Sequence, residues 1–110
     1  MMAQEALETI IEVYEHAKFS DEILIPKKEL SNLFHIITGR YIIWSYGYRE
    51  AFKKAYDINK DALRKALIAL LERSNRDFQK YASKYPSLKE EYNKKITVNK
   101  ELIERLRTLW

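Results

Sequence analysis

Apolar residues recur three or four positions apart along most of the chain, and this spacing limits the possible folds more than any other feature. It is the repeat of a helix that buries one face, whereas a half-buried strand alternates apolar and polar residues. Only two glycines and two prolines interrupt the 110 residues, and strong helix formers dominate. We therefore predict an all-α fold, a compact helical bundle of four to six helices without strands. A chain of this length is expected to form one domain, residues 1–110.

Turn-forming residues set the expected helix boundaries in the first half. The first helix should span about residues 3–18, and Ile25 should lie outside a helix because it precedes a proline. Pro26 suits the first position of the second helix. Gly39 is either a helix end or a residue inside one long helix, and because the next apolar stripe crosses it without losing phase, we favour a continuous or merely kinked helix there. The stripe consists of Leu30, Leu33, Ile37, Tyr41, Trp44, Tyr48, Ala51 and Ala55.

Two further helices are expected in the second half. Asp57 or Asn59 can cap a helix that ends before Pro86. Ser87 and Glu90 have the spacing of a capping box for the last helix, within which Asn99 is a candidate break or second cap. The apolar stripes of these helices are Leu63, Leu67, Leu70, Ser74, Phe78, Tyr81 and Tyr85, then Leu88, Tyr92, Ile96, Leu102, Leu106 and Leu109.

The stretch GRYIIWSYGYREAFKKAY mixes aromatic and basic residues, which is typical either of a core with a solvated edge or of a surface that stacks on bases. Tyr46 is out of phase with the apolar stripe and shares a helical face with Arg49 and Lys53. It is therefore the first candidate for stacking on a base, the alternative being an exposed tyrosine without a role. The in-phase aromatic residues are expected in the core: Tyr41, Trp44 and Tyr48.

Residues for catalysis are scarce, so we predict a binding protein and not an enzyme, without a cofactor or a metal. There is no cysteine and no glycine-rich phosphate loop. Glu12 and His16 lie one turn apart, but no third metal ligand is evident. His35 is expected to be partly buried with its hydrogen bonds satisfied. Small all-α ribonucleases of the HEPN type place an arginine shortly before a histidine, whereas Arg40, the first arginine here, follows both histidines.

Charge is distributed unevenly along the chain. Residues 1–25 hold six acidic residues and one basic residue, a net of −5, and the other residues hold nineteen basic and ten acidic, a net of +9. Such a basic region attracts polyanions, of which nucleic acid is the commonest. A row of cations at one-turn intervals can follow phosphates, although a solvated helix face is the alternative. The row consists of Arg73, Arg76, Lys80 and Lys84, with Arg64 and Lys65 earlier and a second patch at Arg49, Lys53 and Lys54.

The stretch FKKAYDINKDALRKALIALL resembles a DNA-binding helix-turn-helix, with NKDALRKAL in the place of the recognition helix. It departs from that motif at Asp57, where glycine is preferred, and at Lys53, where a small residue is normal. The resemblance implies a set of residues facing the major groove: Asn59, Lys60, Asp61 and Arg64.

In size, helix content and basic rows the whole chain resembles the small α-helical subunit of CRISPR interference complexes. The resemblance implies a non-catalytic subunit whose copies stack along the complex and hold nucleic acid by backbone contacts. The charge asymmetry further suggests that the acidic first helix meets a neighbouring basic copy. Coat proteins of archaeal filamentous viruses are a similar alternative. The backbone contacts would be made by Arg49, Lys53, Lys54, Arg64, Arg73, Arg76, Lys80 and Lys84.

The expected partners are thus nucleic acid, with RNA and DNA both open, and other protein subunits, including copies of this chain. A protein–protein interaction module and a helix-turn-helix regulator remain the alternatives. No apolar run reaches the roughly 18 residues that a membrane span needs, and the acidic N-terminal stretch lacks the features of a signal peptide. We therefore expect a cytoplasmic protein that does not contact membranes.

Overall fold

The computed structural model describes residues 2–15 and 25–108, without the side chains of residues 2, 3, 44 and 45. Within these ranges the chain forms α-helices and no strand, which confirms the predicted all-α bundle. A 3₁₀ turn at Pro86–Leu88 joins the last two helices. The helices are α1 (Met2–Glu15), α2 (Lys27–Thr38), α3 (Ile43–Lys84) and α4 (Lys89–Thr108).

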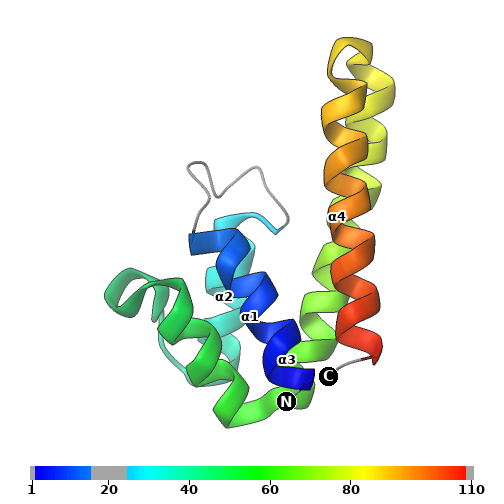
Figure 1. Ribbon diagram of the computed structural model, residues 1–110. Helices are drawn as coiled ribbons and strands as arrows, with labels where there is room; N and C mark the ends of the chain where they lie inside the picture. The colour runs from blue at the N-terminus through cyan, green and yellow to red at the C-terminus, as the bar shows by residue number, and fades with distance from the viewer. Residues whose placement is uncertain (1, 16–24, 109–110) are drawn as a thin grey trace.

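The last two helices form a long antiparallel hairpin, as Figure 1 shows. The helices α1 and α2 and the first part of α3 pack around one end of this hairpin, and the other end projects away from them. The main core lies at the packed end. Its largest fully buried side chains are Tyr14, Phe34, Phe52, Ile10, Ile11, Ile25, Leu30, Leu63, Leu67, Leu71 and Leu106.

Gly39 ends α2, so the predicted continuous helix across this residue is wrong. Its φ of 78° is left-handed, and its N–H donates to the carbonyl oxygen of His35 at 2.7 Å. Only glycine adopts this conformation without a steric cost. After the turn the chain resumes a helix at Ile43, and the apolar spacing continues in phase. Spacing alone therefore does not distinguish this turn from a continuous helix.

The turn after Gly39 determines which of the aromatic residues that follow it are buried. Tyr41 is 52% exposed and not in the core; its ring stacks on that of His35, with centroids 4.1 Å apart. His35 is partly buried as predicted, but its Nδ1 has no hydrogen-bond partner among the described residues. Tyr48 packs against the core as predicted. The side chain of Trp44 lies outside the described part of the structure.

Helix α3 is interrupted at Gly47 (φ 79°, ψ 177°) and at Asn59 (φ −154°, ψ 83°). The side-chain oxygen of Asn59 accepts a hydrogen bond from the N–H of Ala62 at 3.1 Å. This contact caps the part of α3 that follows, as predicted for Asn59. The interruption at Gly47 separates Tyr46 from Arg49, so the helical face predicted to join them is not continuous.

Helix α4 passes through Asn99 without a break, so the predicted interruption there is wrong. Asn99 is fully buried against α3, and its Nδ2 donates to Oδ1 of Asn75 at 2.8 Å. A buried asparagine pair of this kind fixes the register of two packed helices, because a shift by one turn leaves polar groups unpaired in an apolar seam.

The remaining boundaries differ from the predictions by a few residues. Helix α2 begins at Lys27, and Pro26 precedes it as the N-cap residue. Ser87 lies in the 3₁₀ turn before α4. The first helix is described as far as Glu15, and residues 16–18 and Leu109 lie outside the described residues. None of the described helices has the length and apolar content needed to cross a membrane.

Candidate nucleic-acid interface

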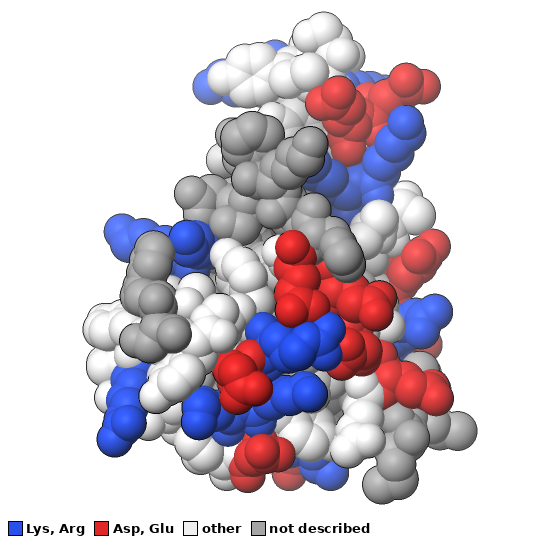
Figure 2. Space-filling view, turned by 60° about the vertical axis from the view of Figure 1, so that its left-hand side comes forward, with Lys and Arg blue, Asp and Glu red and all other residues white. Residues whose placement is uncertain are grey.

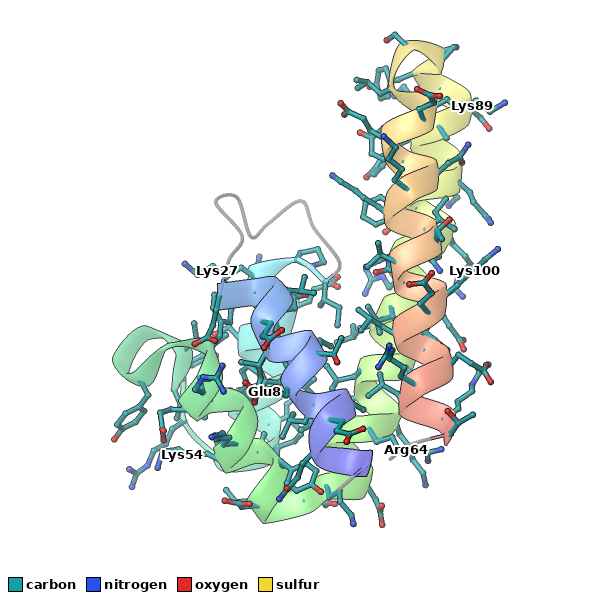
Figure 3. All side chains as sticks on the ribbon, viewed as in Figure 1. Glu8, Lys27, Lys54, Arg64, Lys89 and Lys100 are labelled. Carbon is teal, nitrogen blue, oxygen red and sulfur yellow. The ribbon has the colours of Figure 1, made fainter. Side chains whose placement is uncertain are left out.

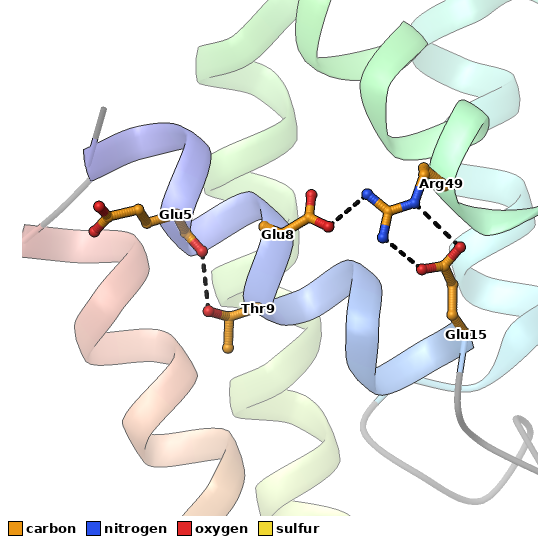
Figure 4. A network of polar contacts seen from close by, with 5 residues as sticks. All are labelled: Glu5, Glu8, Thr9, Glu15 and Arg49. Atoms are coloured by element: carbon orange, nitrogen blue, oxygen red, sulfur yellow. Dashed lines mark hydrogen bonds and ion pairs between the residues drawn. The ribbon is translucent and has the colours of Figure 1, made fainter.

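The predicted cations fall into two groups, those bound by groups of the chain itself and those facing solvent. Arg49 belongs to the first group. It reaches from α3 to α1, where its Nε and one Nη donate to the two carboxylate oxygens of Glu15 at 3.2 and 2.6 Å, and the other Nη contacts Glu8 (Figure 4). Hydrogen bonds to Glu15 first, and then to Glu8, raise the pKa of Arg49. Two carboxylates therefore compensate its charge, and the acidic α1 has a partner inside its own chain.

Arg64 is bound at the packed end of the hairpin, close to the end of α4 (Figure 3). Its Nε donates to the carbonyl oxygen of Leu106 at 2.8 Å, and an Nη donates to that of Arg107 at 3.4 Å. The last carbonyls of a helix lack partners within the helix, so a guanidinium is a favourable cap for them. In a helix-turn-helix, Arg64 would face the major groove of DNA, and a turn of three to four residues would precede its helix. Here Arg64 is bound to α4, and the helix before it is interrupted at the single residue Asn59.

The other residues of the predicted patches are partly balanced by neighbours. Arg73 forms an ion pair with Glu29 of α2 at 3.1 Å. The Nζ of Lys54 lies 5.0 Å from the ring centroid of Tyr46, a cation–π contact. Lys53 is exposed and lines a small pocket beside α1 together with two acidic residues, Glu8 and Asp57. Lys60 and Lys65 are exposed on α3. Over the middle of the face in Figure 2, basic and acidic side chains lie side by side.

The projecting end of the hairpin carries three cations of the second group in one row, whereas Lys60 and Lys65 of that group lie outside it. We call residues 73–95 the distal hairpin. Within it Arg76, Lys80 and Lys84 are exposed, and none of them has an ion pair within the described residues. The buried side of α3 here is formed by Phe78 and Ala82. At 100° per residue, the three cations lie on the opposite face, turned away from α4.

A shallow, open depression on α3, which we call the groove, follows this basic row. Gln79 and Ser83 line it beside Arg76, Lys80 and Lys84. The same two residues also line a neighbouring depression, together with Ala82, Pro86, Lys89 and Asn93. Lys89, at the tip of the hairpin in Figure 3, thus extends the basic surface from α3 to α4. Cations flanking amide and hydroxyl donors are the groups that bind phosphate oxygens.

The distal hairpin is one of two stretches of the chain that each carry a net charge of +4; the other, residues 26–54, holds six basic and two acidic residues. Residues 73–95 contain seven basic and three acidic residues, a net of +4, which equals the net charge of the whole chain. The other residues contain thirteen of each sign. The comparison of residues 1–25 with the remainder of the sequence did not reveal this distribution. A charge count in a sliding window would have shown both basic stretches.

The described residues form no cluster of side chains that could hold a metal ion. Within residues 2–15 and 25–108, no three histidine, aspartate or glutamate side chains gather as metal ligands. His16, of the weak pair with Glu12, lies outside the described residues. The chain matches no protein-family model, no curated protein and no solved structure.

Proposed function

We propose that this protein is a non-catalytic, helical nucleic-acid-binding protein that contacts the phosphate backbone without sequence specificity. The distal hairpin is the binding element. In this proposal the chain acts as a repeated subunit of a larger nucleoprotein complex, as the small subunits of CRISPR interference complexes do.

The observation that carries this proposal is a row of exposed cations one turn apart on one helix face, in contrast to the predicted arginines that the chain itself binds. Arg49, Arg64 and Arg73 are engaged by acidic side chains or carbonyl oxygens. Arg76 and Lys80, by contrast, lie exposed along a groove and have no ion pair among the described residues. Like charges one turn apart disfavour an isolated helix by about 0.2–0.5 kcal/mol per pair. A bound polyanion offsets this repulsion and releases its own counterions.

Phosphate contacts of this kind orient a polymer but do not read its sequence. The groove residues are cations, amides and hydroxyls on one exposed helix face, and such groups meet any phosphate in the same way. Specificity must then come from other parts of the complex.

Reversal of two charges in the row tests the proposal. We expect the double variant R76E/K80E to bind fluorescent oligonucleotides much more weakly than the wild type at low salt, measured by anisotropy. Each phosphate neutralised on a single strand contributes about −0.7 to the slope of log affinity against log salt. Three or four contacts give a wild-type slope of about −2 to −3, and the variant should lose about 1.4 of it.

The matched control is K28E/R105E, which changes the net charge by the same amount. Lys28 lies on α2 and Arg105 near the end of α4, both exposed and outside the distal hairpin. We expect the control to keep most of the affinity. Equal losses in both variants would show that only total charge matters and would refute the assigned site. If the wild type does not bind at low salt, the protein-interaction alternative replaces this proposal.

A further inference from the structure

The distal hairpin also presents aromatic rings beside its basic row. We propose that Tyr81 and Tyr85 form a platform on which the bases of a single-stranded nucleic acid stack while its phosphates lie along the row. This inference rests on the proposed function and narrows it to single strands.

The two tyrosines are exposed although their spacing predicted a buried face. Tyr81 is 44% and Tyr85 45% exposed, and Leu88, which follows in the 3₁₀ turn, is 40% exposed. The seam with α4 is instead filled by Asn75, Phe78 and Ala82. These large side chains at the tip of the projecting hairpin thus stay more than a third exposed after the two helices have packed. Rings that remain available to solvent are available to a ligand.

Rings inside the hairpin support the platform. Tyr81 contacts Tyr92 of α4, with ring centroids 5.7 Å apart, and Tyr92 stacks on Phe78 at 5.8 Å. The Nζ of Lys95 lies 5.6 Å from the Phe78 centroid and 5.7 Å from that of Tyr92. Tyr81 is therefore held on one side by a packed aromatic pair, which lowers the entropic cost of binding on its other side.

Tyr85 is held by the geometry of the tip. Its N–H donates to the carbonyl oxygen of Tyr81 at 2.8 Å, and its own carbonyl oxygen accepts from Leu88 at 3.0 Å. It precedes Pro86, which disfavours the helical region, and its φ of −123° and ψ of 79° lie outside that region. The backbone of Tyr85 is therefore held at the tip by these hydrogen bonds.

Lys84 joins the platform to the basic row. It lines the groove with Arg76 and Lys80, and its Nζ lies 5.5 Å from the ring centroid of Tyr85. Phosphates and bases alternate along a strand, so a surface that places cations and rings side by side complements both. In a duplex the bases are paired and stacked inside, and the rings cannot reach them. Sequence-tolerant binding of single strands combines these two features, a basic track and exposed aromatic rings.

The test compares the double variant Y81A/Y85A with Y81F/Y85F, which keeps both rings. The probes are a single-stranded oligonucleotide of mixed sequence, the same strand with abasic sites, and its duplex. Removal of a stacked ring costs about 5- to 150-fold in affinity per base. We expect the alanine variant to lose at least about fivefold on the intact strand and little on the duplex, and the phenylalanine variant to keep its affinity.

The abasic strand separates stacking from charge, since it retains the phosphates. It should bind the wild type more weakly than the intact strand does, and bind wild type and Y81A/Y85A equally. Tyr41→Ala removes an exposed tyrosine outside the distal hairpin and should leave all affinities unchanged. Far-ultraviolet circular dichroism verifies that each variant is folded.

The outcomes distinguish this inference from the function on which it rests. Salt-sensitive binding that is equal in wild type and Y81A/Y85A would overturn the stacking platform and leave backbone binding intact. Absence of binding by the wild type would overturn both. Tyrosine-dependent binding to vesicles of anionic phospholipid, without binding to oligonucleotides, would overturn both and make the tip a membrane contact.

Discussion

At the scale of single residues, Tyr14 shows how one side chain fixes the path of the chain. Its hydroxyl donates to the carbonyl oxygen of Ile25 at 2.8 Å and accepts from the N–H of the same residue at 2.7 Å. Both residues are buried. The two bonds hold the start of the segment that leads into α2 against α1, and they satisfy backbone groups that would otherwise be buried without partners.

The substitution Tyr14→Phe should lower the free energy of unfolding at pH 7 by about 1–3 kcal/mol, because buried groups of Ile25 lose their partner. Burial also raises the pKa of the Tyr14 hydroxyl above its ordinary value of 10.0, with smaller contributions from nearby groups. Above that pH the unfolded chain releases the proton and the folded chain keeps it. Stability conferred by Tyr14 should then fall by about 1.4 kcal/mol per pH unit.

Urea unfolding at pH 7, 10 and 11 measures both effects. The difference between wild type and Tyr14→Phe isolates Tyr14 from the other tyrosines and the lysines, which titrate in both proteins. If the free energies of unfolding of wild type and Tyr14→Phe changed in parallel above pH 10, the Tyr14 hydroxyl would not be buried in the folded state.

At the scale of the elements, two glycines decide where helices end and bend. Gly39 ends α2 with φ at 78°, and Gly47 interrupts α3 with φ at 79° and ψ at 177°. A Cβ at either position would meet open space. The requirement for glycine is therefore one of backbone conformation and not of packing.

Substitution of either glycine by alanine should destabilise the protein, although alanine is the better helix former. We expect Gly47→Ala to lower the free energy of unfolding by about 1–3 kcal/mol, because its conformation is almost restricted to glycine. Gly39→Ala should cost about 1–2 kcal/mol, and Gly39→Asn less, since asparagine tolerates the left-handed region. In an uninterrupted helix each alanine would instead stabilise by about 1 kcal/mol. The sign of the change in the free energy of unfolding, measured in urea, therefore distinguishes a chain interrupted at these glycines from an uninterrupted helix.

At the scale of the whole molecule, the protein has a four-helix packed end and a two-helix projecting end. The 20 residues of α4 span about 30 Å, most of the longest dimension of 41 Å. Leu63, Leu67 and Leu106 belong to the main core, whereas Phe78 and Ile96 are buried but lie outside it. Apart from the ion pair between Arg73 and Glu29 of α2, the distal hairpin is held within the described part of the chain by contacts among α3, α4 and the 3₁₀ turn.

We expect the rate of hydrogen exchange to differ between the distal hairpin and the packed end. Backbone amides of residues 76–95 should exchange by an opening of lower free energy than those of residues 63–71 and 102–106, because fewer apolar contacts are lost when they open. Mass spectrometry of peptic fragments measures this difference. A bound oligonucleotide should slow exchange mainly in the distal hairpin, and protection spread evenly over both ends would place the ligand elsewhere.

The sequence by itself determined the fold class, most helix positions and the presence of a basic row at Arg76, Lys80 and Lys84. These depend on local properties, namely apolar spacing, propensity and the order of charges along one helix. The cap at Asn59 was also visible, because a side chain bonding its own backbone is a local event.

Which of these features remain exposed depends on how the helices pack against one another. The helix end at Gly39 escaped prediction because the apolar stripe resumes in phase after the turn. The engagement of Arg49 and Arg64 depends on residues more than thirty positions away, and local patterns carry no record of such partners. Tyr81 and Tyr85 had the spacing of a core stripe, but the register of α3 against α4 left them in solvent. Burial and charge compensation are properties of packed pairs of elements, and they arise only when the helices meet.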